Sequence, residues 1–337
     1  MWAIILKVLI LVCYLLLGLA TAIEGVLAQA ECDIPPPPTV SQTVVQKLPL
    51  NAKQRSALQA ALDGHHYDTA EFLLASEIQQ NPRSAQLLAF LGSVSFLNGN
   101  CINAAIAIKK AEALNALENR DRFILAMAYV ALERPNWARP EPEKLARSDQ
   151  KRPLYPYWLS RLDYRDMNFE SAATNAQRAI DLDPTFMKAY DNLGLTYEAL
   201  GKLDEAIKAY QQAATLDQQE NIRSPWPLLN LGALLLKVGR LNEAETDLRE
   251  SLNCNPRFLQ AHFQLGFLLE HEERIGEAIR ELEEAIACES NYPEPYYALG
   301  RIYNRIGDEA KAKRAFSTFQ ELKELKSRDS KSRTQSK

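Results

Sequence analysis

The chain has 337 residues, 47% of them hydrophobic, and its 39 basic and 43 acidic side chains give a formal net charge of −4. This charge, without any stripe of interleaved basic and aromatic residues, argues against nucleic acid as a partner. None of the four histidines forms an i, i+4 pair, and the sequence has no Cys-x-x-Cys, phosphate-binding glycine loop or Gly-x-Ser-x-Gly. We therefore predict no metal site, no cofactor and no catalytic centre.

Residues 1–30 have the composition of a targeting segment. Trp2 to Leu19 is almost wholly apolar, interrupted only by Lys7, and Ala28-Gln29-Ala30 has the small-x-small pattern of a cleavage site. We predict a cleaved signal peptide, a mature chain that begins at Glu31, and a periplasmic or secreted bacterial protein. The alternative is an uncleaved membrane anchor facing outside the cytoplasm, since about 18 apolar residues lie at the lower limit for a bilayer span.

Residues 31–50 follow the cleavage site. Pro35 to Pro38 predict a stiff polyproline conformation, so we expect a Pro-rich spacer ahead of the folded part. The segment also contains Cys32, the first of four cysteines in the mature chain. Its pairing with Cys101 remains an open possibility.

From residue 51 onward, small residues recur at a fixed interval. Eight alanines are separated by six steps of 34 residues and one of 38, and Leu-Gly pairs recur in register, each glycine twelve residues before one of these alanines. Such a period is typical of a stacked repeat array. The ladder alanines are Ala70, Ala104, Ala138, Ala172, Ala206, Ala244, Ala278 and Ala312, and the glycines are Gly92, Gly194, Gly232, Gly266 and Gly300.

Residues 187–220 show what one repeat contains. Tyr190, Leu193, Gly194 and Tyr197 share one face of a first helix by their spacing, Gly201 ends that helix, and the apolar stripe of a second helix follows. Two antiparallel helices can approach closely only where neither carries a bulky side chain. We therefore expect the ladder alanines to be buried between paired helices.

The spacing Tyr190-Leu193-Gly194-Tyr197 followed by Ala206-Tyr210 resembles the tetratricopeptide repeat (TPR), and Tyr296-Leu299-Gly300-Tyr303 with Ala312-Phe316 matches it again. The resemblance implies an all-α, right-handed α-solenoid of about eight helix-turn-helix hairpins over 51–326. It also implies a binding protein rather than an enzyme. We assign the repeats to 51–84, 85–118, 119–152 (degenerate), 153–186, 187–220, 225–258, 259–292 and 293–326.

The repeat at 119–152 departs from the pattern, because its second helix would contain Pro135, Pro140 and Pro142. A proline inside a helix costs roughly 3 kcal/mol, so we predict a loop over 134–142 and a shorter helix after it. Two interpretations remain open: a lid or partner contact that uses Trp137, or a decayed repeat that packs irregularly. An enzyme built on this loop is a further alternative, but no nucleophile, metal set or phosphate loop accompanies it.

The last repeats and the tail give three smaller expectations. His262 stands where the TPR pattern has an aromatic packing residue, so we expect a core histidine. Cys254 and Cys288 occupy equivalent positions in adjacent repeats, about 8–10 Å apart, which is too far for a disulfide. Residues 327–337 are rich in Lys, Arg and Ser, and we predict a disordered polar tail.

The TPR resemblance also implies where a partner binds, because the first helix of each hairpin lines the concave face. Aromatic rings beside arginines occupy these positions, which is the composition of a protein-binding hot spot. We therefore predict a scaffold or adaptor of the cell envelope that binds a protein or extended peptide in this groove. The competing interpretation is that the superhelix partly closes and the rings pack on one another or on the N-terminal segment. The candidate residues are Tyr157, Arg161, Arg165, Lys188, Asn192, Trp226, Asn230, Phe263, Phe267, Tyr297, Arg301 and Arg305.

Two of these residues suggest how a peptide is held. Asn192 and Asn230 each stand directly before Leu-Gly and resemble the asparagine ladder in the TPR arm of O-linked N-acetylglucosamine transferases, which holds peptide backbone. Gln264 and Ala298 interrupt the ladder. The resemblance implies recognition of an extended peptide by side-chain amides, and not glycosyl transfer.

Overall fold

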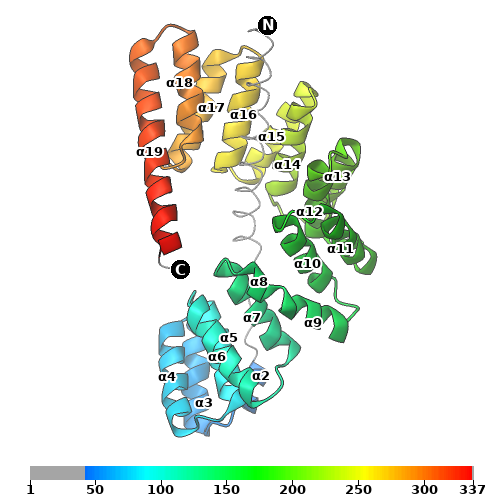
Figure 1. Cartoon of the computed structure of the whole chain (residues 1–337), viewed down its shortest axis with the longest axis vertical. Coiled ribbons are helices and arrows are strands. Elements are labelled where there is room, and N and C mark those ends of the chain that lie inside the picture. Colours follow the sequence, from blue (N-terminus) through cyan, green and yellow to red (C-terminus); the bar gives the residue numbers. More distant parts are fainter. Residues whose placement is uncertain (1–41, 336–337) are drawn as a thin grey trace. The chain divides into compact units, whose positions relative to one another are not determined.

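The computed structural model describes residues 42–335, which are predominantly α-helical and contain no β-strand (Figure 1). This part of the chain divides into two compact units, residues 42–182 and 183–335. Within each unit, consecutive helices pair into hairpins that pack on their neighbours, so the predicted all-α solenoid is confirmed. None of the helices in residues 42–335 is both long and apolar enough to cross a bilayer. The predicted signal peptide or anchor at 1–30 lies outside the described residues.

The first unit contains a short helix followed by four hairpins, the third of which has a divided second helix. The helices are α2 (Gln42–Lys47), α3 (Ala52–Asp63) with α4 (Tyr67–Gln80), α5 (Ala85–Leu97) with α6 (Cys101–Leu114), α7 (Asn119–Ala131) with α8 (Pro135–Ala138) and α9 (Pro140–Ser148), and α10 (Leu154–Arg165) with α11 (Phe169–Leu182).

The second unit contains four hairpins of regular helices. They are α12 (Met187–Ala199) with α13 (Leu203–Glu220), α14 (Trp226–Lys237) with α15 (Leu241–Cys254), α16 (Leu259–His271) with α17 (Ile275–Cys288), and α18 (Glu294–Arg305) with α19 (Glu309–Gln335).

The glycine and alanine ladders mark the points where the two helices of a hairpin meet. Seven of the eight ladder alanines are 0% exposed and Ala312 is 4% exposed, as predicted. Each Leu-Gly glycine faces a large side chain sixteen residues later, so a methyl group at the glycine would overlap that side chain. An added Cβ would lie 2.4 Å from Ile108 at Gly92, 2.5 Å from Tyr210 at Gly194, 2.8 Å from Leu248 at Gly232, 2.8 Å from Leu282 at Gly266 and 2.6 Å from Phe316 at Gly300.

Where the glycine is replaced, the opposing residue changes with it. Ser160 holds the glycine position of the fourth repeat, and the residue sixteen positions later is the small Ala176. The Ser160 hydroxyl donates to the carbonyl of the ladder residue Ala172 over 2.6 Å. In the fourth hairpin the volumes of the two facing side chains are therefore adjusted together, which keeps its helices close.

The end of the segment predicted as a spacer, 31–50, folds onto the first hairpin. Val45, Leu48 and Leu50 are buried in one core cluster with Leu58 and Leu74. This contact covers the apolar end of the array, which explains why a spacer is the wrong description of residues 42–50. Pro35 to Pro38 lie outside the described residues.

The loop predicted over 134–142 is wrong, because two of the three prolines expected to break the helix instead begin one, and the third, Pro142, lies in the first turn of α9. Pro135 and Pro140 occupy first-turn positions of α8 and α9, where a missing backbone N–H leaves no hydrogen bond unmade. The chain is interrupted only at Arg139. Its guanidinium pairs with Asp163 and with Asp166, at 2.7 Å each, and so fastens the break to α10 and the residue after it.

Trp137, on the short helix α8, is 60% exposed. Its ring meets that of Tyr129 edge-on at 5.7 Å between centroids, and the Arg134 guanidinium lies 5.6 Å from the ring centre. The ring is therefore held in place on one side and open to solvent on the other.

The single 38-residue step is absorbed by a helix and not by a loop. Helix α13 has 18 residues, whereas α11, α15 and α17 have 14 each. The difference of four residues equals the excess of 38 over 34 and adds about one turn to α13.

Residues 327–335, which fall in the predicted disordered tail, continue α19, and this helix ends at Gln335. From residue 309 to 335 the sequence has neither glycine nor proline, so nothing stops the helix. Arg328 adds an i, i+4 pair with Glu324 at 3.7 Å.

His262 is a buried core residue, as predicted. Its Nδ1 lies 2.8 Å from Glu281 Oε2 and its Nε2 lies 3.0 Å from the carbonyl oxygen of Pro256. Burial acts to lower the pKa of the ring, but these hydrogen bonds and the Glu281 charge outweigh it, so the pKa of His262 is raised. Cys101, Cys254 and Cys288 are free thiols, and Cys32 lies outside the described residues.

The raised pKa of His262 predicts a dependence of stability on pH. The contribution is fully present below the unfolded pKa of about 6.5 and is lost as the pH rises through the higher folded pKa. His262→Leu introduces the residue that the preceding repeat has at this position, Leu228, and should remove this dependence. Thermal unfolding of both proteins at a series of pH values measures it, and parallel curves would contradict the assignment.

The close approach at the hairpin crossings predicts opposite effects of two identical substitutions. Gly266→Ala should lower the Tm, because the new methyl group overlaps Leu282 and overpacking costs about 1–3 kcal/mol. Gly276→Ala places the same methyl group in open space on α17. It should leave the Tm unchanged or raise it, since alanine is favoured over glycine in a helix by roughly 1 kcal/mol. Circular dichroism melts measure both, and equal shifts would refute the packing described.

Candidate functional site

The candidate residues fall on the first helices of the hairpins, and the two units must be considered separately. In the first unit they lie on α10, which is buried on every side from Tyr155 to Tyr164. Tyr157 is 1% exposed and meets the Trp158 ring edge-on at 5.6 Å, and Arg161 is 5% exposed and donates to the Tyr157 hydroxyl over 3.2 Å. The expectation that these two side chains form an open contact surface is therefore wrong.

Arg165, one turn further along α10, is partly exposed. Its pKa is lowered by burial and by the nearby charges of Arg139 and Arg161, although Asp166 acts in the opposite direction. Its Nε and Nη2 have no hydrogen-bond acceptor in the part of the chain that the structure describes. Both nitrogens are themselves buried, so neither is open to a carboxylate of a partner, although the Arg165 side chain as a whole is partly exposed.

In the second unit we call the surface formed by α12, α14, α16 and α18 the first-helix face. Asn230, on α14, donates to Asp191 on α12 over 2.9 Å. Asn192 is 1% exposed, because α12 is buried all round from Asp191 to Thr196. The expected open ladder of Asn192 and Asn230 is thus wrong at Asn192, which is buried. Asn230 is already hydrogen-bonded to Asp191, the residue that precedes Asn192.

The structure brings Phe267, Tyr297 and Arg301 together between α16 and α18. The Arg301 guanidinium lies 5.9 Å from the centre of the Phe267 ring and 5.8 Å from that of Tyr297. It also pairs with Glu270 at 2.6 Å. Tyr297 is 40% exposed and Phe267 is partly exposed. We call these four residues the aromatic–arginine cluster.

The remaining candidates lie around this cluster. Trp226 and Phe263 are partly exposed, and each packs edge-on against a neighbouring ring, Phe258 at 4.9 Å and Tyr292 at 6.2 Å. Lys188 is partly exposed and Arg305 is exposed. Tyr297 is flanked by Phe316 at 5.9 Å and by Phe319 at 5.1 Å between ring centroids. Phe316 belongs to the repeat motif, whereas Phe258, Tyr292 and Phe319 were not predicted as supporting rings.

The side chains of the aromatic–arginine cluster can make contacts with a partner. No group of three His, Cys, Asp or Glu side chains within residues 42–335 is placed to hold a metal ion. Rings and a guanidinium that are held in place by neighbours lose little conformational freedom when a partner covers them, which is the property of interface hot spots.

Stacked helical hairpins with this close-packed crossing define a repeat protein. Two segments match models of the tetratricopeptide repeat family, residues 185–256 and 293–324. They contain both sequence motifs that resemble this repeat. The chain therefore contains tetratricopeptide repeats in these two segments.

Solved structures share the fold at low sequence identity. The Cut9–Hcn1 hetero-tetramer of the APC/C matches with a TM-score of 0.59 and 18% identity, over 77% of this chain and 51% of the matched chain. Yeast Tom70 matches with a TM-score of 0.57 and 16% identity, over 88% of this chain and 65% of the matched chain. The type IV pilus biogenesis factor PilW matches with a TM-score of 0.55 and 19% identity, over 60% of this chain and 92% of the matched chain. This chain therefore spans about half of the first and under two thirds of the second. None of the curated protein sequences matches it.

These likenesses show the fold, and the repeat family gives a general role. A TPR array supports a scaffold for protein–protein interactions, and TPR proteins are typically scaffolds rather than enzymes.

Proposed function

We propose that this chain is a non-enzymatic scaffold that binds a peptide or protein segment along the first-helix face of its second unit. The observation that carries the proposal is the aromatic–arginine cluster, in which Phe267 and Tyr297 present ring surface on either side of Arg301. Aromatic and arginine side chains contribute most of the binding free energy at protein interfaces.

The charges around the cluster indicate how a partner is oriented. The Arg301–Glu270 pair is mostly shielded, with side-chain exposures of 30% and 13%, so it fixes the guanidinium between the rings. Arg305, one turn further along α18, is exposed and can take a partner carboxylate. Asn230 retains a second amide hydrogen and its carbonyl oxygen for a peptide backbone. Apolar partner side chains then pack on Phe263 and Phe267.

The effect of the cluster can be tested with a partner captured by cross-linking from envelope extract. Phe267→Ala should weaken binding of that partner by about 1–2 kcal/mol while helicity and Tm stay nearly unchanged, because the ring is partly exposed. Phe72→Ala is the matched control, since Phe72 is 74% exposed on the second helix α4 and should leave the affinity unchanged. Arg161→Ala should instead lower the Tm. If Phe267→Ala unfolds the protein without a specific loss of affinity, its ring belongs to the core and the proposed face is wrong.

We further propose that the chain acts outside the cytoplasm, in the cell envelope. The support is the apolar run from Trp2 to Leu19 followed by Ala28-Gln29-Ala30. A chain that keeps this run would be a membrane-tethered assembly factor with the same binding face.

Intact-mass analysis of the exported protein distinguishes these forms. Cleavage after Ala30 should give a mature chain that begins at Glu31. A mass that includes Met1 would support the tethered form, and a start at Ile23 would show that cleavage uses an earlier small residue.

A further inference from the structure

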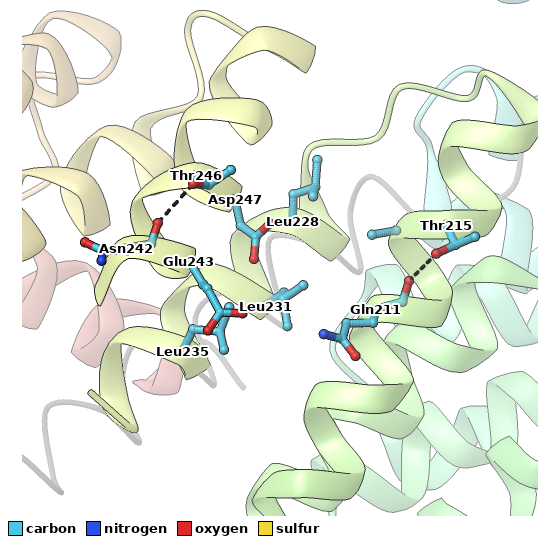
Figure 2. A pocket seen from close by; sticks show the side chains of 10 residues that line it. Gln211, Thr215, Leu228, Leu231, Leu235, Asn242, Glu243, Thr246 and Asp247 are labelled. Atoms are coloured by element: carbon cyan, nitrogen blue, oxygen red, sulfur yellow. Dashed lines mark hydrogen bonds between the residues drawn. The ribbon is translucent and has the colours of Figure 1, made fainter. Parts of the chain in front are cut away.

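The second helices of the second unit enclose a groove that is separate from the first-helix face. It lies between α13 and α15, has a volume of about 610 Å³, and has side chains of α14 at its floor (Figure 2). Leu231 and Leu235 form the apolar floor, and both are almost fully buried. We call it the α13–α15 groove. It is lined by Gln211, Ala214, Thr215, Leu228, Leu231, Leu235, Asn242, Glu243, Thr246 and Asp247.

The next junction along the same unit, between α15 and α17, shows how such a groove is closed from within. Arg249 on α15 reaches Glu277 on α17 at 3.8 Å, and Arg274, which precedes α17, reaches Glu245 on α15 at 2.8 Å. His262, from the floor helix α16, bonds Glu281 on α17 at 2.8 Å. Three cationic or titratable side chains therefore satisfy the carboxylates of this junction.

The α13–α15 groove has none of these three bridges. By the repeat register, Gln211 replaces Arg249, Leu228 replaces His262 and Ile207 replaces Glu245. Arg240, the counterpart of Arg274, pairs with Glu243 beside it at 2.5 Å. No ion pair between described residues joins α13 to α15.

The carboxylate left without a partner is that of Asp247, the counterpart of Glu281. It makes no hydrogen bond or ion pair with any described residue, although it is only partly exposed. Burial raises its pKa to about 6, with Glu250 and Glu243 adding to the effect and Arg240 opposing it. A cation placed beside this carboxylate would restore what His262 supplies to Glu281.

We propose that the α13–α15 groove is a second binding site, which takes a short segment of a partner protein that carries lysine or arginine next to leucine-sized apolar side chains. The basic group of the partner faces Asp247 and Glu243. It takes the place that His262 and Arg249 of this chain occupy at the neighbouring junction. The apolar group packs on Leu228, the partly exposed leucine of the lining. This site does not depend on the first-helix face, so the chain can hold two partners at once.

The repeat register supplies the variant that tests this proposal. Gln211→Arg with Leu228→His transfers both missing residues from the neighbouring junction, so it should close the groove without weakening the fold. Gln212→Arg is the matched control, because it adds the same charge to the same helix at an exposed position outside the groove. The Tm of the double variant should be at least that of the wild type.

The probes are two sets of short synthetic peptides. Every peptide has two leucines, which are adjacent in some peptides and up to one helical turn apart in others. The residues beside the leucines are lysine in the first set and glutamate in the second. Lysine peptides should bind the wild type and the Gln212→Arg control in fluorescence anisotropy, and glutamate peptides should not. The double variant should bind at least tenfold more weakly, as should Asp247→Asn, whereas Phe267→Ala should bind as the wild type does. That last comparison separates this site from the first-helix face.

Four results would overturn the proposal. Equal binding of lysine and glutamate peptides would show that the carboxylates play no part. Undiminished binding to a folded double variant would place the peptide elsewhere, and no binding by any lysine peptide at millimolar concentration would exclude the site. Self-association of the chain that the double variant abolishes would make a second copy the occupant, in place of a separate partner.

Discussion

The close approach of two helices at each hairpin crossing is the constraint on which the rest of the structure depends. A glycine on the first helix leaves room for a large side chain on the second, such as Tyr210 against Gly194 or Phe316 against Gly300. This contact sets the spacing within a hairpin, and the ladder alanine beside it keeps the helices in register. Because neighbouring hairpins stack on this unit, the positions of all first helices, and so of the first-helix face, follow from it.

The same constraint explains where binding surfaces can form. Residues that close the hairpins are fixed by packing, whereas residues between neighbouring hairpins can differ from one junction to the next. At one such junction His262 and Arg249 close the surface, and at the adjacent junction Leu228 and Gln211 leave it open. Partner recognition is thereby confined to side chains whose replacement leaves the crossing intact.

The hairpins could be predicted from the sequence because their defining contacts join residues sixteen or fewer positions apart. The divided helix at Pro140 could not be predicted. A proline is tolerated in the first turn of a helix and disruptive in its interior, and the sequence alone did not show where the helix begins. The burial of Tyr157 and Arg161 was also missed, because spacing along α10 does not show how many sides of that helix are covered. The α13–α15 groove did leave a signal: Asp247 aligns with Glu281, but the residue that aligns with His262 is a leucine.

The shared geometry of the crossings has a consequence for how the chain folds. In the second unit all four first helices present a glycine, so each of them could accept the large residue of a wrong second helix while the chain is still collapsing. Repeat proteins are prone to such misassembly between like elements. In the first unit, Leu58 pairs with Leu74, and Ser160 bonds the carbonyl of Ala172. A first helix that carries Leu58 or Ser160 does not fit the second helix of another hairpin. The irregular repeats therefore resist mispairing of helices and can fix the register of the array.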